Sequence, residues 1–184
     1  MHRRVYQEFE SICSKFNVNG YVLEIGAVPT EDSLLTMKAL ANATKKIGIN
    51  LDGPYKLKDF EILRLNANNM NIFADNSFDL VLSNATLEHD KYFWKTIAEI
   101  KRVVKSGGWV ILGTPGYHSL RWFKALKAES IFDTTLTMRI HNYPGDYYRF
   151  STQTFKEVFF KDMIDVEIRR IMVPPRIIGY GRKP

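Results

Sequence analysis

The sequence predicts an α/β fold in which a doubly wound, mainly parallel sheet forms a single domain over residues 1–184. The first observation behind this prediction is that segments with helical periodicity alternate with short apolar runs along the whole chain. The second is that no linker, repeat or low-complexity tract divides the chain. Helices that alternate with buried strands imply a parallel sheet covered on both faces. Such sheets bind ligands at the carboxyl ends of their strands, near the point where the strand order reverses.

Four helices are expected where apolar residues recur every three or four positions. In the third of them, Phe93, Ile97 and Ile100 form one apolar stripe, and Ser106-Gly107-Gly108 is expected to end the helix. The four segments are Val5 to Phe16, Glu31 to Ala41, Phe93 to Val104, and a last helix that is capped by Ser151 and contains Phe155, Val158 and Phe159.

Seven strands are expected in short apolar runs that turn residues separate from the helices. Asn19-Gly20 breaks the first helical pattern just before the first of these runs. The seven are Tyr21 to Ile25, Lys46 to Asn50, Glu61 to Leu65, Phe78 to Leu82, Trp109 to Leu112, Val166 to Met172 and Arg176 to Tyr180.

Composition places the chain among globular proteins of a reducing compartment. Hydrophobic residues make up 45% of it and charged residues 25%, which excludes disorder. The basic start of the chain is followed by Glu8, Glu10 and Lys15, so it lacks the apolar core of a signal peptide, and no stretch is long enough to span a membrane. The single cysteine, Cys13, cannot form an internal disulfide, and with scattered histidines it predicts no metal site. We therefore expect a cytoplasmic protein.

Charge is distributed unevenly along the chain, whose net charge is +6. Residues 1–92 hold 10 Lys and Arg against 12 Asp and Glu, whereas residues 93–184 hold 16 against 8. The basic second half could attract an anionic partner such as a nucleotide-linked sugar, a phospholipid or RNA. A solvated basic face without a partner explains the charge equally well.

Three segments carry a resemblance to a known family. They are Val22 to Gly26, Asp75 to Val81, and Leu87-Glu88-His89 followed by Glu99 to Gly108. In order and spacing they resemble the type-11 group of class I S-adenosylmethionine-dependent methyltransferases, over roughly residues 20 to 115. The resemblance implies a Rossmann-like methyltransferase fold, S-adenosyl-L-methionine as cofactor, and methyl transfer as activity.

The resemblance also implies which residues hold the cofactor. The loop with Glu24 and Gly26 would cradle its methionine part, Asn50 with Asp52 would face the ribose, and Asn66 would lie near the adenine. The pocket would be completed by Asn84, Leu87 and His89.

This chain departs from the family pattern at three of these places. Val28 and Thr30 stand where relatives carry glycine, and Asn50 and Asn66 stand where relatives carry an acid. Asn50 is a poorer acceptor for ribose hydroxyls than a carboxylate. A second interpretation therefore stays open, in which a catalytically silent methyltransferase fold serves as a binding or scaffold protein.

The acceptor side is expected in a long connection from Thr114 to Phe150, a candidate lid. Within it, His141 to Ser151 resembles a His…Pro…Asp-Tyr-Tyr-Arg-Phe segment of small family members. A turn at Pro144-Gly145 would bring His141, the candidate general base, toward Asp146 and leave Arg149 to anchor an anion. The alternative is a packed turn in which Asp146 pairs with Arg149.

These observations predict O-methylation of a small anionic or sugar-containing acceptor. Methyl transfer from a sulfonium needs no protonated leaving group, so the protein has to position the acceptor and remove its proton. RNA is a less favoured acceptor, because the sequence shows no aromatic platform for single strands.

Overall fold

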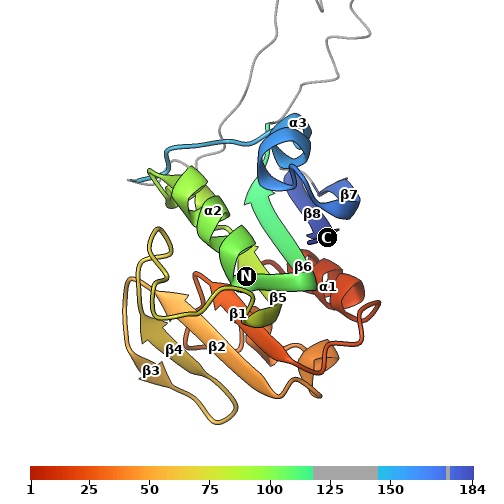
Figure 1. Ribbon diagram of the computed structural model, residues 1–184. Coiled ribbons are helices and arrows are strands. Elements are labelled where there is room, and N and C mark those ends of the chain that lie inside the picture. The colour runs from red at the N-terminus through yellow and green to blue at the C-terminus, as the bar shows by residue number, and fades with distance from the viewer. Residues whose placement is uncertain (118–144, 173–174) are drawn as a thin grey trace, which may run out of the picture.

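One eight-stranded sheet forms the centre of the computed structural model, which describes residues 1–117, 145–172 and 175–184 (Figure 1). The strand order is β3-β4-β2-β1-β5-β6-β8-β7. The strands are β1 (Tyr21–Ile25), β2 (Lys45–Asn50), β3 (Tyr55–Lys56), β4 (Glu61–Arg64), β5 (Phe78–Asn84), β6 (Val104–Pro115), β7 (Ile164–Ile171) and β8 (Arg176–Arg182).

The predicted mainly parallel sheet is confirmed, but the predicted number of seven strands is wrong. The five central strands, from β4 to β6, pair in parallel, and β8 then runs antiparallel to both β6 and β7. The additional strand is β3, whose Tyr55 and Lys56 pair antiparallel with Ile62 and Glu61 of β4. Two exposed residues show no periodicity of their own, so this edge hairpin could not be found from the apolar pattern.

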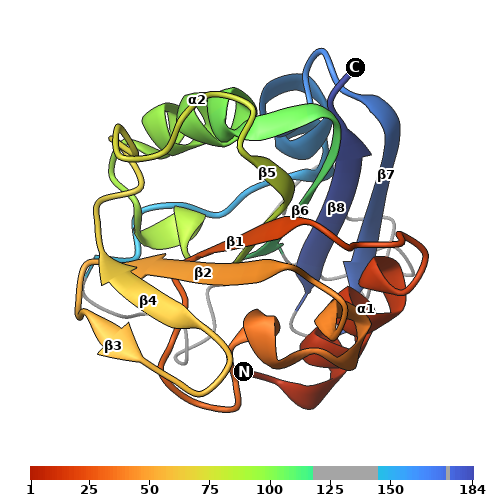
Figure 2. The ribbon, with the colours of Figure 1, turned by 60° about the horizontal axis from the view of Figure 1, so that its bottom comes forward.

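Helical elements cover both faces of the sheet, as Figure 2 shows for α1 and α2. Val5, Phe9 and Ile12 of α1 pack with the even-numbered residues of β1 and β5 on one face. Ile97 and Ile100 of α2 pack with the odd-numbered residues of the same strands on the other. The helical elements are α1 (Arg3–Cys13), η1 (Leu34–Thr36), η2 (Lys38–Leu40), η3 (Leu87–His89), α2 (Phe93–Val103), α3 (Thr152–Thr154) and the π-helical turn η6 (Phe155–Phe159).

The helix predicted from Glu31 to Ala41 is wrong, because this segment forms two short 3-10 turns, η1 and η2. Met37 between them is extended, with φ −59° and ψ 136°. The backbone N–H groups of Leu34 and Leu35 donate to the side chain of Glu24 in β1. The Glu24 carboxylate thus accepts hydrogen bonds from the amides at the start of η1. This tertiary contact stabilises the short turns over a continuous helix.

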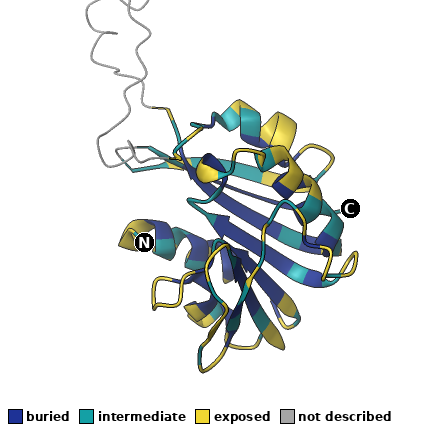
Figure 3. Ribbon diagram, turned by 90° about the vertical axis from the view of Figure 1, so that its left-hand side faces the viewer, coloured by how far each residue is buried: buried dark blue, intermediate teal, exposed yellow. Residues whose placement is uncertain are grey.

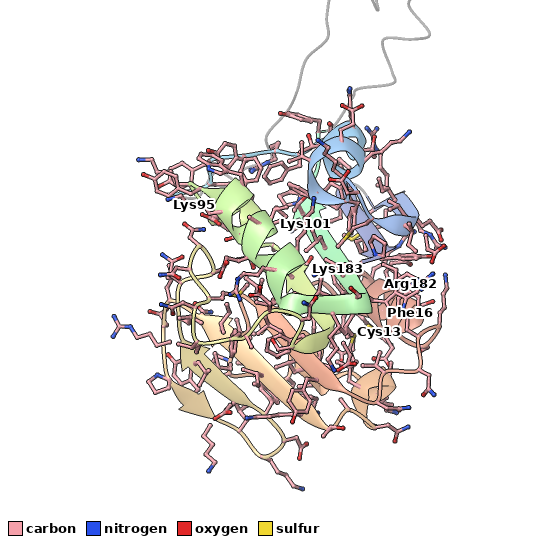
Figure 4. The ribbon with its side chains drawn as sticks, viewed as in Figure 1. Cys13, Phe16, Lys95, Lys101, Arg182 and Lys183 are labelled. Atoms are coloured by element: carbon pink, nitrogen blue, oxygen red, sulfur yellow. The ribbon has the colours of Figure 1, made fainter. Side chains whose placement is uncertain are left out.

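The helix predicted from Phe93 ends at Val103, earlier than the Ser106-Gly107-Gly108 signal. Val104 is already extended, with φ −71° and ψ 137°, and begins the long strand β6. Lys183, labelled in Figure 4, fastens this junction because its ammonium donates to the carbonyl oxygens of Lys101 and Val104 at 2.7 and 2.9 Å. The predicted cap at Ser151 is confirmed, since its hydroxyl accepts from Thr154 N at 3.0 Å.

The buried residues lie along the central strands and on the sides of the helices that face them, whereas exposed residues lie on the outer sides of the helices and in the loops (Figure 3). Central residues such as Val22, Leu23 and Val81 are fully buried. In the described part of the chain, no helix combines the length and the apolar character that a bilayer crossing requires.

Strand order reverses between β1 and β5, because the chain passes from β1 to β2 on one side and from β5 to β6 on the other. The carboxyl ends of these strands are aligned, with Ile25 opposite both Ile49 and Ser83. This edge is the point at which doubly wound sheets bind their ligands.

Candidate functional site

A cavity of about 440 Å³ lies at the carboxyl ends of β1, β2, β4 and β5. Its wall is formed by residues 25–26, 49–51, 65–68, 85–86, 89–92 and 147. The first four of these segments end or follow a parallel strand, residues 89–92 connect η3 to α2, and residue 147 comes from the chain before α3. Its size lies within the range of about 300 to 1,000 Å³ in which proteins bind small organic molecules.

Gly26 forms the turn with which the chain leaves β1. Its φ is +79°, and a Cβ at this position would lie 2.1 Å from Thr86 Oγ1. The amides of Gly26 and Ala27 both donate to Ile49 O, at 2.9 and 3.2 Å. Positive φ and the close approach of Thr86 together require glycine. Val28, where relatives carry another glycine, has no positive φ and lies outside the cavity wall.

Glu24 holds the loop that follows β1 from inside the protein. Its carboxylate accepts from Ser33 Oγ at 2.5 Å, from Leu34 N at 3.1 Å and from Leu35 N at 3.4 Å. Only 3% of the residue is exposed, and it does not line the cavity. Burial raises the pKa of this carboxyl to about 7, although the three hydrogen bonds oppose the shift.

Asn50 joins the end of β2 to the β1 loop. Its side-chain Nδ2 donates to Ala27 O at 2.8 Å, and its Oδ1 accepts from Asp52 N at 3.3 Å. The orientation of the amide follows from its partners, because a carbonyl oxygen can only accept and a backbone N–H can only donate. Asn50 lines the cavity, whereas Asp52 is exposed and does not.

A polar network braces the opposite wall of the cavity. Asn66 Oδ1 accepts from Asn68 N at 2.9 Å, and Asn68 Nδ2 donates to Asp90 Oδ2 and to Thr96 Oγ1, both at 2.8 Å. Thr96 Oγ1 donates to Asp90 Oδ2 at 2.6 Å, and Tyr92 N donates to Asp90 Oδ1 at 2.9 Å. Both carboxylate oxygens of Asp90 are therefore engaged within the protein.

His89 lies in the cavity wall between a backbone carbonyl and a buried carboxylate. Its Nδ1 is 3.2 Å from Gly145 O, and its Nε2 is 4.0 Å from Glu88 Oε1. Because Gly145 O only accepts, Nδ1 carries the hydrogen of this bond, and in the neutral ring Nε2 is the proton-accepting nitrogen. The Glu88 side chain is 1% exposed and that of His89 is 41% exposed.

Asp146 and Arg149 form a buried, bidentate ion pair. Arg149 Nη2 donates to Asp146 Oδ2 at 2.5 Å, and Nη1 donates to Oδ1. The Arg149 side chain is 13% exposed, and the Asp146 side chain is 3% exposed. The amides of Tyr147 and Tyr148 donate to Glu88 O at 2.8 and 3.2 Å, which fastens this segment to η3.

Residues 34–112 match the family model described as a methyltransferase domain. Over these residues the sequence is similar to methyltransferase domains of type 11. No curated protein matches its sequence.

Solved methyltransferase structures share the fold of this chain over nearly its whole length. A SAM-dependent methyltransferase from Archaeoglobus fulgidus superposes with a TM-score of 0.69 at 12% identity, covering 100% of this chain and 95% of its own. The 1,6-didemethyltoxoflavin-N1-methyltransferase of Burkholderia thailandensis gives 0.69 at 13% identity, with 99% and 79% covered. Phosphoethanolamine N-methyltransferase 2 of Haemonchus contortus, in complex with S-adenosyl-L-methionine, gives 0.67 at 14% identity, with 99% and 53% covered. The chain thus spans about half the length of the Haemonchus enzyme, and at these identities the likeness concerns the fold alone.

The fold brings four of the predicted cofactor residues to one cavity, namely Gly26, Asn50, Asn66 and His89. Four others lie outside its wall: Glu24 and Asp52, already described, and Asn84 and Leu87. Leu87 is 1% exposed in the core, and Asn84 at the end of β5 has an Oδ1 that is buried without a hydrogen-bond partner among the described residues. Their part in cofactor binding stays a prediction.

On the acceptor side, the structure describes Asp146 and Arg149 but not His141, which lies outside the described residues together with most of the predicted lid from Thr114 to Phe150. The Asp146–Arg149 contact is that of the packed-turn alternative. Within the described ranges, no group of three or more His, Cys, Asp or Glu residues is placed to hold a metal ion.

Sequence reasoning missed Lys91 and the Asp90 network. Asp90 follows Leu87-Glu88-His89 directly and precedes α2, a position in which Asp commonly binds backbone amides. Lys91 is the one lysine or arginine among the described residues of the cavity wall. The spacing of apolar residues predicts neither the place of Lys91 in the cavity wall nor the hydrogen bonds of Asp90.

Proposed function

We propose that this domain transfers the methyl group of S-adenosyl-L-methionine to an oxygen of a small anionic or sugar-containing acceptor. The observation that carries the proposal is the cavity at the switch point, with the Gly26 turn on one side and Asn50 on another. A turn that excludes even a Cβ lets the backbone approach a ligand closely. The polar groups of the wall lie around an otherwise apolar space, which suits a cofactor with both polar and apolar parts.

We assign the parts of this cofactor to the segments of the cavity wall that the strand ends provide. The Gly26 turn would receive its amino-acid part, Asn50 its ribose, and Asn66 with Ala67 its base. When bound, the cofactor supplies an electrophilic methyl group on a sulfonium, whose departure needs no protonation. The protein then has to orient the acceptor and to accept its proton.

His89 is the described residue best placed to take that proton. It lines the cavity, and its Nδ1 faces Gly145 O at 3.2 Å, which directs the free electron pair of the neutral ring to Nε2. His141 remains the second candidate, on the sequence resemblance alone. We assign the attraction of an anionic acceptor to Lys91 in the cavity wall, because Arg149 is already engaged by Asp146.

The reaction would take place in the cytoplasm, since the single cysteine, Cys13, is free and buried and suits a reducing compartment. RNA is not favoured as acceptor, because the described cavity wall offers one lysine and two exposed aromatic rings, Tyr92 and Tyr147, which are few for a strand of successive bases.

Two measurements test the proposal. Calorimetric titration with S-adenosyl-L-methionine and its demethylated product, S-adenosylhomocysteine, tests cofactor binding. Transfer of a tritiated methyl group to UDP-glucose, glucose 6-phosphate or 4-hydroxybenzoate tests the acceptor class, because each combines a hydroxyl with an anionic group. If the cofactor binds but no methyl group is transferred to any of the three acceptors, the cofactor site stands and the proposed acceptor class is refuted. Absence of binding would favour the scaffold interpretation instead.

A further inference from the structure

Glu88 carries a buried carboxylate, one oxygen of which accepts no hydrogen bond from the described residues. Its side chain is 1% exposed, and its Oε2 has no hydrogen-bond partner among the described residues. A buried acceptor without a donor loses its hydrogen bonds to water and gains none in return, so proteins retain few of them. Such a group next to a ligand cavity is a candidate for a functional role.

The charges that face Glu88 come from three different parts of the fold. His89 Nε2 from η3 and Arg176 Nη1 from β8 are each 4.0 Å from Glu88 Oε1. Asp146 adds a negative charge from the segment before α3, and Arg149 adds a positive one beside Arg176. At 4.0 Å both contacts of Oε1 are longer than hydrogen bonds, so the interaction is one of charge.

The same residue also controls the position of the histidine ring through its backbone. Glu88 O accepts from the amides of Tyr147 and Tyr148, and this places Gly145 O beside His89 Nδ1. One residue therefore holds both neighbours of the ring, the carbonyl that binds Nδ1 and the carboxylate that faces Nε2.

We propose that Glu88 is a positioning residue for proton removal, whose carboxylate offsets the positive charge that His89 gains when it takes the proton of the methyl acceptor. This inference rests on the proposed function and deepens it. In the step, the acceptor oxygen forms its bond to the methyl carbon while the sulfonium sulfur regains the electron pair of the broken bond. The proton of the acceptor moves to His89 Nε2, and Nδ1–H continues to donate to Gly145 O. Charge is conserved, because the positive charge passes from sulfur to the imidazole ring beside Glu88.

Carbon-13 NMR of the protein's own carboxyl groups tests the pairing without cofactor or acceptor. Glutamate labelled at Cδ gives one signal for Glu88, identified by its absence in Glu88→Gln. Burial raises the pKa of the Glu88 carboxyl to about 7, while the charges of His89 and Arg176 oppose this shift. Removing the ring in His89→Ala should move the Glu88 titration to higher pH. His2→Ala is the control, since His2 lies at the start of α1 and should leave the titration unchanged.

An unchanged Glu88 titration in His89→Ala would overturn the proposal. Should that variant fail to fold, the Glu88 titration is measured in His89→Gln, which keeps a donor toward Gly145 O. An unchanged titration in this variant would overturn the proposal in the same way. The experiment needs neither cofactor nor acceptor. A protein that shows the coupling but binds no S-adenosylhomocysteine would refute the proposed function and leave the pairing in place.

A kinetic cycle then tests the role in catalysis on whichever of the three acceptors above takes the methyl group. We expect Glu88→Gln to slow transfer by about tenfold or more and to keep S-adenosylhomocysteine affinity within about twofold. Glu88→Gln added to His89→Ala should cause no further loss, because the carboxylate acts through the ring. Losses that multiply independently would show that Glu88 does not act through His89. Glu61→Gln, which removes a carboxylate from a surface pair with Lys45, is the matched control.

Discussion

The side-chain amide of Asn50 donates to the carbonyl oxygen of Ala27 at 2.8 Å, so the end of β2 holds the loop that leaves β1. A carboxylate is a better acceptor for ribose hydroxyls than Asn50 is, which on its own would favour tighter cofactor binding by Asn50→Asp. The hydrogen bond to Ala27 argues for the opposite result. A carboxylate cannot donate, and it would face the Ala27 carbonyl oxygen with a negative charge.

We therefore predict that Asn50→Asp weakens S-adenosylhomocysteine binding and lowers the free energy of unfolding by about 1 to 2 kcal/mol. Calorimetry and thermal unfolding measure the two effects. Asn66→Asp is the comparison for stability, because Asn66 uses its oxygen to accept from Asn68 N and a carboxylate retains that bond. Tighter binding by Asn50→Asp would mean that the ribose contact outweighs the lost hydrogen bond.

The buried pair of Asp146 and Arg149 is predicted to stabilise the fold. Removing one partner leaves a buried charge without its counterpart, which typically costs about 3 to 5 kcal/mol. Arg149→Ala should thus lower the unfolding temperature strongly. The double variant Asp146→Ala with Arg149→Ala should lose less than the sum of the single losses. A stable Arg149→Ala whose only defect is a raised Michaelis constant for the acceptor would support the anchoring role expected from the sequence.

His89→Ala is predicted to reduce methyl transfer by about a hundredfold or more, because a general base is lost. Affinity for S-adenosylhomocysteine should fall much less, since the ring acts on the acceptor proton. The measurement is single-turnover transfer from tritiated S-adenosyl-L-methionine beside a calorimetric titration. Equal activity of His89→Ala and wild type would return the general-base assignment to His141.

Stability should decrease as the pH rises from about 5 to 8. Burial raises the pKa of both Glu24 and Glu88 to about 7 from 4.5, so the folded chain retains protons that the unfolded chain releases. This contribution is complete below pH 4.5 and is lost as the pH passes through 7. The carboxyls of Asp79, Glu99 and Glu167 have lowered pKa values and act in the opposite sense, but only at lower pH.

Glu88→Gln isolates one of these two groups. The free energy of unfolding of the variant minus that of wild type should increase by on the order of 2 kcal/mol from pH 5 to pH 8, because only wild type loses the contribution of the protonated Glu88. Urea unfolding at both pH values measures the difference, from which the titrating groups that do not interact with Glu88 cancel. A constant difference would show that Glu88 has the same pKa in the folded and unfolded chain.

The central strands were predictable because each is a short apolar run whose residues are buried on both faces, as Val22 and Leu23 in β1 illustrate. The helix at Glu31 to Ala41 was not, since its backbone amides bind a carboxylate from a distant strand. Local periodicity contains no information about such a partner.

For the site, strand ends could be located from the sequence, and this was sufficient to place Gly26, Asn50 and Asn66 in one cavity wall. The direction of a side chain could not. Glu24 immediately precedes two cavity residues, yet alternation along β1 turns it to the α1 side, where Ser33 binds it. The Asn68–Asp90–Thr96 network likewise joins three segments whose approach depends on the folded chain.

Binding of S-adenosylhomocysteine to wild type, Gly26→Ala and Gly107→Ala tests the central claim most directly. Both glycines have positive φ, +79° and +78°, so alanine strains the backbone equally. A Cβ at Gly26 meets Thr86 Oγ1 at 2.1 Å, whereas a Cβ at Gly107 has nothing within 4 Å. We predict that Gly107→Ala binds within about twofold of wild type and that Gly26→Ala loses about tenfold or more in affinity. Wild type that shows no binding heat at millimolar ligand, or Gly26→Ala that binds as wild type does, would contradict a cofactor site in this cavity.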